Sequence, residues 1–105
     1  MAIAMREKEV FLREVFHDCV VVAQRFEEDC FVMDIDSSNG FTSAECIRFF
    51  SARVHRMNGF PNRTIWIYDE QYRVDDGYEI HIFGSKAGRN HECVIKTSDV
   101  MVKYP

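Results

Sequence analysis

The residues with the clearest chemical potential lie between Asp34 and Glu45, where acidic and hydroxyl side chains recur at short intervals. Asp34, Asp36 and Ser38 place oxygen atoms at alternate positions, and Glu45 adds a carboxylate at the twelfth position of the window. Clustered carboxylate and hydroxyl oxygens are the ligands that Ca²⁺ prefers in proteins. One hypothesis for this chain is therefore a calcium-binding domain that uses these four side chains.

The same window, residues 34–45, resembles the calcium loop of an EF-hand. It departs from that loop at the sixth position, where Asn39 stands in place of the usual glycine. Turn and helix-start chemistry explains the window equally well. Ser37 to Gly40 has the composition of a turn, and Thr42 with Glu45 matches a helix capping box. No second such loop occurs in the sequence, so calcium binding is an alternative and not our first hypothesis.

Histidine and cysteine offer two further kinds of site. The pairs His17–Cys19 and His91–Cys93 could each chelate a soft metal such as zinc if they lie on strands, because residues i and i+2 share a face. A thiol nucleophile beside an imidazole would instead make a small enzyme or ligand-binding domain; the candidates are Cys93 or Cys46 with His81, His91 or His55. Neither zinc spacing nor a nucleophile signature is present, so we expect a non-enzymatic chain without a cofactor.

Composition bounds the class of protein. The chain has 105 residues, 47% of them hydrophobic, which suits one globular domain over residues 1–105. It contains no apolar run long enough to span a membrane and no visible export signal. The four cysteines include no CxxC pair, as expected of free thiols in a reducing compartment. We therefore predict a cytoplasmic protein.

The charges are unevenly distributed. The formal net charge is −4, and residues 1–36 hold nine acids against four bases, whereas residues 37–105 hold eight against nine. An acidic chain is a poor candidate for nucleic-acid binding, because phosphate recognition needs a basic surface. A local basic face remains conceivable in the second part, and its members would be Arg48, Arg53, His55, Arg56, Arg63, Arg73, Lys86 and Arg89. We prefer to interpret these residues as an ordinary solvated surface.

The apolar spacing predicts two helices. The first covers residues 6–16, and its period continues through residues 19–26, although the β-branched run from Val20 to Val22 favours a strand there. The second begins at the capping box of Thr42, carries a stripe from Ala44 to Met57, and ends at Asn58-Gly59. Whether residues 19–26 are helix or strand stays open. If they form a strand, Glu27 to Asp29 is a hairpin turn.

The remaining segments alternate as strands do. We predict strands over residues 30–36, 64–68, 72–74, 78–83, 91–97 and 100–102, with a hairpin turn at Asp76-Gly77 and a loop over residues 84–90. The expected fold is α+β: two helices packed on a mostly antiparallel sheet of four to six strands, in the order α-β(β)-α-β-β-β.

Large aromatic residues on one strand face suggest the first hypothesis for function. A small non-enzymatic binding or regulatory module would dock such a face on another protein, or on a second copy of itself. The candidate interface residues are Trp66, Tyr68, Tyr72 and Tyr78, together with an acidic patch of Glu27, Glu28 and Asp29.

Overall fold

The protein is an all-β structure, seen in a computed structural model that describes residues 6–105. Strands make up 62% of it, and those residues contain no helix, so the predicted α+β fold with two helices is wrong. None of the described residues forms a helix that could cross a membrane. The strands are β1 (Glu7–Lys8), β2 (Val20–Glu27), β3 (Cys30–Asp36), β4 (Cys46–Phe50), β5 (Arg53–Met57), β6 (Thr64–Val74), β7 (Gly77–Lys86), β8 (Arg89–Thr97) and β9 (Asp99–Lys103).

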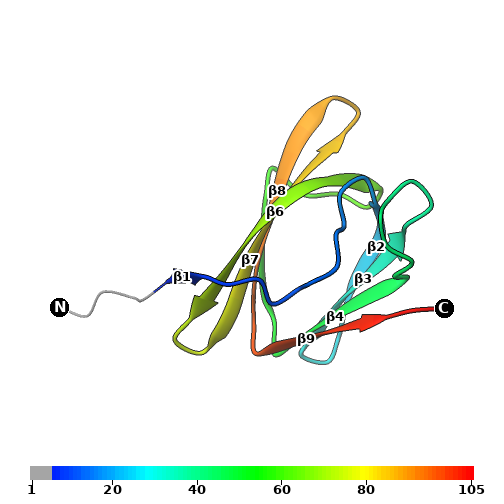
Figure 1. Cartoon of the computed structure of the whole chain (residues 1–105). Helices are drawn as coiled ribbons and strands as arrows, with labels where there is room; N and C mark the ends of the chain where they lie inside the picture. Colours follow the sequence, from blue (N-terminus) through cyan, green and yellow to red (C-terminus); the bar gives the residue numbers. More distant parts are fainter. Residues whose placement is uncertain (1–5) are drawn as a thin grey trace.

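The strands form one antiparallel sheet that curls into two halves (Figure 1). Its order is β5-β8-β7-β6-β2-β3-β4-β9, and β1 pairs with β6 beside this path. The halves β5-β8-β7-β6 and β2-β3-β4-β9 are joined where Val20 and Val21 of β2 pair with β6. They are joined again where β4 continues into β5 and β8 into β9. Buried residues from both halves form one continuous hydrophobic core between them.

The segment from Glu9 to His17 crosses between the two halves in extended form (Figure 1). The predicted first helix is therefore wrong, although two residues of its apolar stripe, Leu12 and Phe16, are buried in the core. The ring of Phe16 stacks on Trp66 with centroids 4.8 Å apart. The segment is extended because it fills the gap between strands, where tertiary packing overrides local helix propensity.

The predicted second helix is replaced by β4 and β5, and a bend at Ser51 explains the error. Ser51 has a φ of 50°, in the left-handed region, which interrupts the alternation of the strand. Ile47 and Phe49 point into the core before the bend, and Ala52 and Val54 pack against it afterwards. These four residues are therefore spaced by two, three and two positions, which resembles the apolar stripe of a helix. Within each strand the inward side chains still alternate with a period of two.

The predicted strand residues all lie in strands, and several strands are longer than the local sequence indicated. The segments 64–68 and 72–74, predicted as two strands, belong to the single strand β6, and the turn predicted at Asp76-Gly77 lies one residue earlier, at Asp75-Asp76. Residues 19–26, left open between helix and strand, lie almost wholly in β2, and β3 spans Cys30–Asp36 as predicted. β7 and β8 extend through most of the expected loop 84–90 to a tight turn at Ala87 and Gly88. Both turn residues have positive φ, 51° and 77°, as the tightest hairpin connections require.

Candidate functional site

The outward side of the half-sheet β5-β8-β7-β6 carries the main candidate site. Hydrogen-bonded register places outward side chains in three rows across β6, β7 and β8: Tyr68, Phe83 and Glu92; Glu70, His81 and Val94; Tyr72, Glu79 and Lys96. Met57 of β5 continues the first row beside Glu92. A bulge between Trp66 and Tyr68 shifts the register of β6 and turns Tyr68 outward, on the opposite side from Trp66. We call these rows, with Met57, the outer face.

A stacked aromatic pair dominates the outer face. The rings of Tyr68 and Phe83 are nearly parallel, with centroids 4.4 Å apart and an interplanar angle of 11°. Tyr68 is nevertheless 53% exposed, and Met57 is 44% exposed at the other end of the row. A cross-strand aromatic pair of this kind is rigid, because each ring restricts the rotamers of the other. The pair is therefore a preformed apolar surface.

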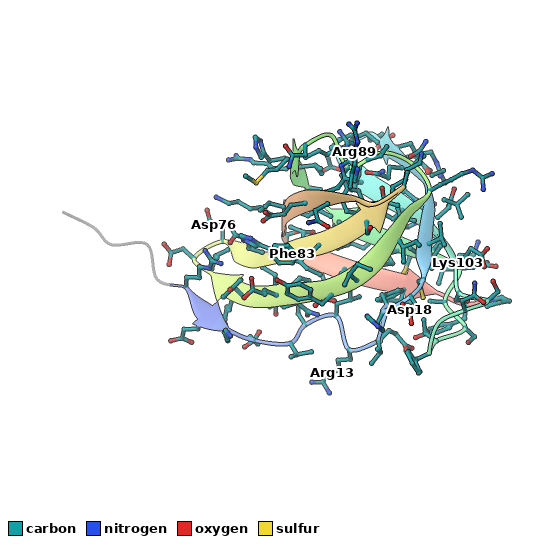
Figure 2. All side chains as sticks on the ribbon, turned by 90° about the horizontal axis from the view of Figure 1, so that it is seen from above. Arg13, Asp18, Asp76, Phe83, Arg89 and Lys103 are labelled. Carbon is teal, nitrogen blue, oxygen red and sulfur yellow. The ribbon has the colours of Figure 1, made fainter. Side chains whose placement is uncertain are left out.

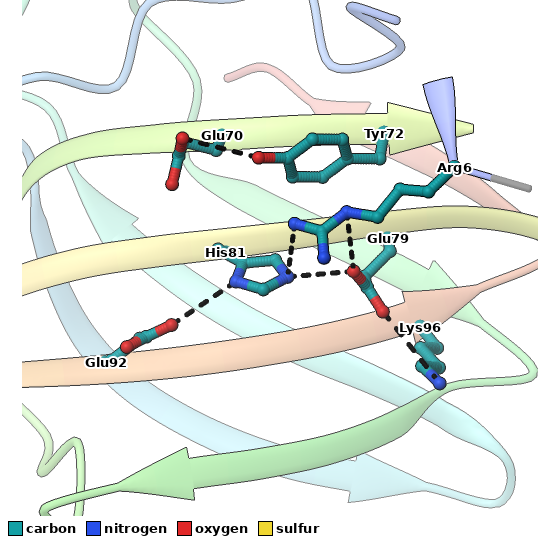
Figure 3. Close-up of polar contacts among 7 residues, drawn as sticks. All are labelled: Arg6, Glu70, Tyr72, Glu79, His81, Glu92 and Lys96. Atoms are coloured by element: carbon teal, nitrogen blue, oxygen red, sulfur yellow. Dashed lines mark hydrogen bonds and ion pairs between the residues drawn. The ribbon is translucent and has the colours of Figure 1, made fainter. Parts of the chain in front are cut away.

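A charged network adjoins the aromatic pair (Figure 3). Glu79 is buried, and its carboxylate lies 2.8 Å from Nε2 of His81, 3.6 Å from Nε of Arg6 and 3.8 Å from Nζ of Lys96. The other imidazole nitrogen, Nδ1, lies 3.3 Å from a carboxylate oxygen of Glu92. The buried carboxylate thus has two cations, Arg6 and Lys96, and the His81 imidazole around it, and a buried charge needs such partners.

Arg6 also packs on the outer face. Its guanidinium carbon lies 3.6 Å from the centre of the Tyr72 ring, a close cation–π contact. The Tyr72 hydroxyl donates to Glu70 at 3.3 Å (Figure 3). These contacts fix the start of the described chain against β6 and β7. Every charged member of the network therefore has a partner within the chain, and the network has the character of a structural support.

A cleft of about 660 Å³ opens beside this network. Its lining mixes cations with acids and hydroxyls: Arg6, Arg53 and Lys96 face Asp75, Asp76 and Glu79, with Ser51, Thr97 and Ser98 among the remaining residues. The charges balance, and the three hydroxyls donate to Asp29 or to backbone carbonyls, so the arrangement supports no particular reaction.

Only part of the predicted aromatic interface lies on the outer face. Tyr68 and Tyr72 do, whereas Trp66 is fully buried in the core and donates its indole N–H to Asp69 at 3.0 Å. Tyr78 points to the opposite side of β7 and stacks on Phe11 at 4.6 Å. The sequence analysis missed Phe83. The observed turn at Asp75-Asp76 pairs it with Tyr68, whereas the turn predicted at Asp76-Gly77 would have paired Tyr68 with Ser85.

The predicted acidic patch lies apart from the aromatic residues. Glu27, Glu28 and Asp29 are at and beside the β2–β3 turn, in the other half of the sheet. Glu27 is paired with Arg25 at 3.1 Å and with Arg48 at 3.5 Å. The chain therefore does not combine the aromatic and acidic candidates into one surface.

Two of the four candidate calcium ligands, Asp34 and Asp36, have carboxylates that are bonded to other partners. Asp34 pairs with Arg25 at 2.6 Å, and the carboxylate of Asp36 accepts from the backbone N–H of Ser38 at 3.0 Å, which lowers the pKa of Asp36. Glu45 bonds through its backbone to Ile35 and Lys103. Between residues 6 and 105, no three His, Cys, Asp or Glu side chains are placed to hold a metal ion.

The structure places Cys93 and one of its candidate partners, His81, on opposite sides of the sheet. Cys93 is fully buried on the core side of β8, and its burial raises the pKa of the thiol to about 12, which opposes formation of a thiolate. His81 projects from the other side of the sheet. His91 bonds the carbonyl of Asn58 at 2.6 Å, and His17 contacts the carbonyl of Ile67. All four cysteines are free and buried.

Comparison with known proteins identifies the family. A family model described as "Protein of unknown function (DUF4085)" matches residues 3–90. Because the match covers most of the chain, the chain belongs to this family. No curated protein and no solved structure matches.

Proposed function

We propose that this member of the DUF4085 family is a small non-enzymatic binding module that docks its outer face on another protein. The observation that carries the proposal is the Tyr68–Phe83 pair, which is stacked at 4.4 Å while Tyr68 remains half exposed. Tyrosine, phenylalanine and methionine are enriched at protein interfaces, and rigid aromatic side chains lose little entropy on binding. Tyr68, Phe83 and Met57 supply these types in one row.

The chemistry of the outer face suggests the character of the partner. The polar groups of Glu79, His81 and Lys96 contact one another within the chain, so the groups left to a partner are mainly aromatic and aliphatic. A complementary surface would therefore present an apolar patch to Tyr68 and Phe83. A second copy of this chain could present such a patch, and the mass of the complex distinguishes that case. The four buried free thiols suit action in the reducing cytoplasm.

Site-specific photo-crosslinking tests the proposal. A benzophenone amino acid placed at position 68 should yield one discrete adduct with a partner in the cells that express the protein. The same group at position 101 is the matched control, because Met101 is 47% exposed and lies on β9, in the other half of the sheet. The adduct from position 68 should disappear when Phe83→Asp is added. Absence of an adduct, or identical adducts from both positions, would refute the proposal.

A further inference from the structure

The end of the molecule at the β7–β8 turn collects positive charge. Residues 46–68 and 80–91 contain six Arg or Lys residues and no acid. The fold gathers four of them near the β7–β8 turn and the loop that follows β5: Arg56, Arg63, Lys86 and Arg89. We call these four residues the basic rim. In Figure 1 this end lies opposite the acidic β2–β3 turn, and Arg89 projects from it in Figure 2.

Neutral hydrogen bonds hold the basic rim in place. Lys86 Nζ donates to the carbonyl of Asn62 at 2.7 Å, and the Asn62 side chain accepts from Gln24 at 3.3 Å. Gln24 in turn accepts from Nε of Arg56 at 3.2 Å. The guanidinium of Arg56 also lies over the Phe31 ring, 5.2 Å from its centre. Lys86 and Arg56 are therefore positioned by a carbonyl, an amide and a ring, none of which neutralises their charge.

Within residues 6–105, no member of the basic rim forms an ion pair, although Arg6, Arg25, Arg48, Arg73 and Lys96 all do. The fold thus brings four like charges together without a counter-charge and keeps them accessible. Such a surface attracts a ligand that presents several negative charges at once. Three of the four cations are arginines, whose planar guanidinium groups match phosphate oxygens well.

We propose that the basic rim binds the phosphate backbone of a nucleic-acid strand. This goes beyond the proposed protein-docking function and uses a different surface. The net charge of −4 argued against nucleic acid because it is a sum over the whole chain and does not show which charges share a surface. Because the structure separates them, a strand can contact the rim without approaching the acidic turn. The contact is independent of base sequence, since phosphates carry no sequence information.

Fluorescence anisotropy with a labelled oligothymidylate of about 12 nucleotides tests this, because site sizes on small β domains are of that order. Four phosphate contacts predict a slope of log K against log salt of about −2.8, hence a loss of about 50-fold in affinity between roughly 50 and 200 mM salt. The double substitution Arg63→Gln/Arg89→Gln should reduce the slope to about −1.4 and the loss to about 7-fold.

The matched control is Arg13→Gln/Lys103→Gln, which removes the same charge from two exposed cations outside the rim. Arg13 and Arg89 lie on opposite sides of the molecule in Figure 2. The control should keep the steep slope. No binding at low salt, or equal slopes for the two double variants, would refute the proposal. Polyglutamate that competes as well as unlabelled oligothymidylate would also overturn it, because the rim would then take acidic proteins.

Discussion

The side chain of Gln71 bonds both backbone groups of Leu12, accepting from its N–H at 2.8 Å and donating to its carbonyl at 3.1 Å. It also accepts from the N–H of Phe11 at 2.9 Å and donates to Asp69 at 2.8 Å. One side chain on β6 therefore replaces the strand partner that the crossing segment lacks. This is how an extended segment without a ladder of its own stays against the core.

Removing the Gln71 amide should loosen the crossing segment. Gln71→Leu leaves the N–H groups of Phe11 and Leu12 without their acceptor, and each unsatisfied buried group costs about 1–3 kcal/mol. Hydrogen exchange should accelerate at Phe11 and Leu12 and stay unchanged in β7, with a lower free energy of unfolding. Unchanged exchange at both amides would contradict this account of the segment.

Trp66 and Tyr68 should respond very differently to substitution, although they are neighbours in the same sequence pattern. Trp66→Ala removes a fully buried side chain that stacks on Phe16 and should cost about 3–5 kcal/mol. Tyr68→Ala removes a half-exposed ring and should cost at most about 1.5 kcal/mol, the scale of one aromatic pair. Urea unfolding measures both. A comparable loss from the two variants would mean that Tyr68 belongs to the core.

The thiol of Cys93 should make stability depend on pH in the alkaline range. Burial raises its pKa from 9.0 to about 12, so the folded state disfavours the thiolate. The contribution of the protonated thiol to the free energy of unfolding is complete below about pH 9 and is lost as the pH rises from about 9 towards 12. At about pH 10 the loss is roughly 1.4 kcal/mol, the energy of one pH unit.

Cys93→Val, which lacks a titrating group there, is the control for this effect. The difference in unfolding free energy between the wild-type protein and Cys93→Val should shift by that amount between pH 8 and pH 10. A difference that stays constant would show that Cys93 does not titrate in this way. The native protein should also resist alkylation at Cys93 near neutral pH.

Gly84 should tolerate no side chain. A Cβ at this position would lie 2.4 Å from Cγ2 of Thr64 and 3.0 Å from both the carbonyl of Ile65 and the Phe60 ring. Gly84→Ala should therefore cost about 1–3 kcal/mol or more by overpacking. Gly88→Ala is the control, because nothing lies near its Cβ and only its φ of 77° is unfavourable, at about 1 kcal/mol. Thr64→Ser should partly rescue Gly84→Ala and leave Gly88→Ala unchanged.

Local sequence determined most strands of this protein and one of its turns. Alternation identified β3, the two ends of β6 and most of β7 and β8, because period two is a property of a few consecutive residues. Glu28 and Asp29 form the turn that was expected between β2 and β3. The β6–β7 turn was predicted one residue too late, at Asp76-Gly77 instead of Asp75-Asp76. The predicted turn would have paired Tyr68 with Ser85, so the pairing of Tyr68 with Phe83 came only from the structure.

Tertiary structure alone decided where those strands bend and which charges meet. The bend at Ser51 shifts the alternation by one residue, so the apolar residues of β4 and β5 together resembled the stripe of a helix. The bulge before Tyr68 shifts the alternation of β6 in the same way and places Trp66 and Tyr68 on opposite sides of the sheet. The basic rim joins residues from β5, the following loop and the β7–β8 hairpin. The net charge of the whole chain hides the fact that the fold separates basic from acidic side chains. Which side chains share a surface depends on the pairing of strands that are distant in the sequence.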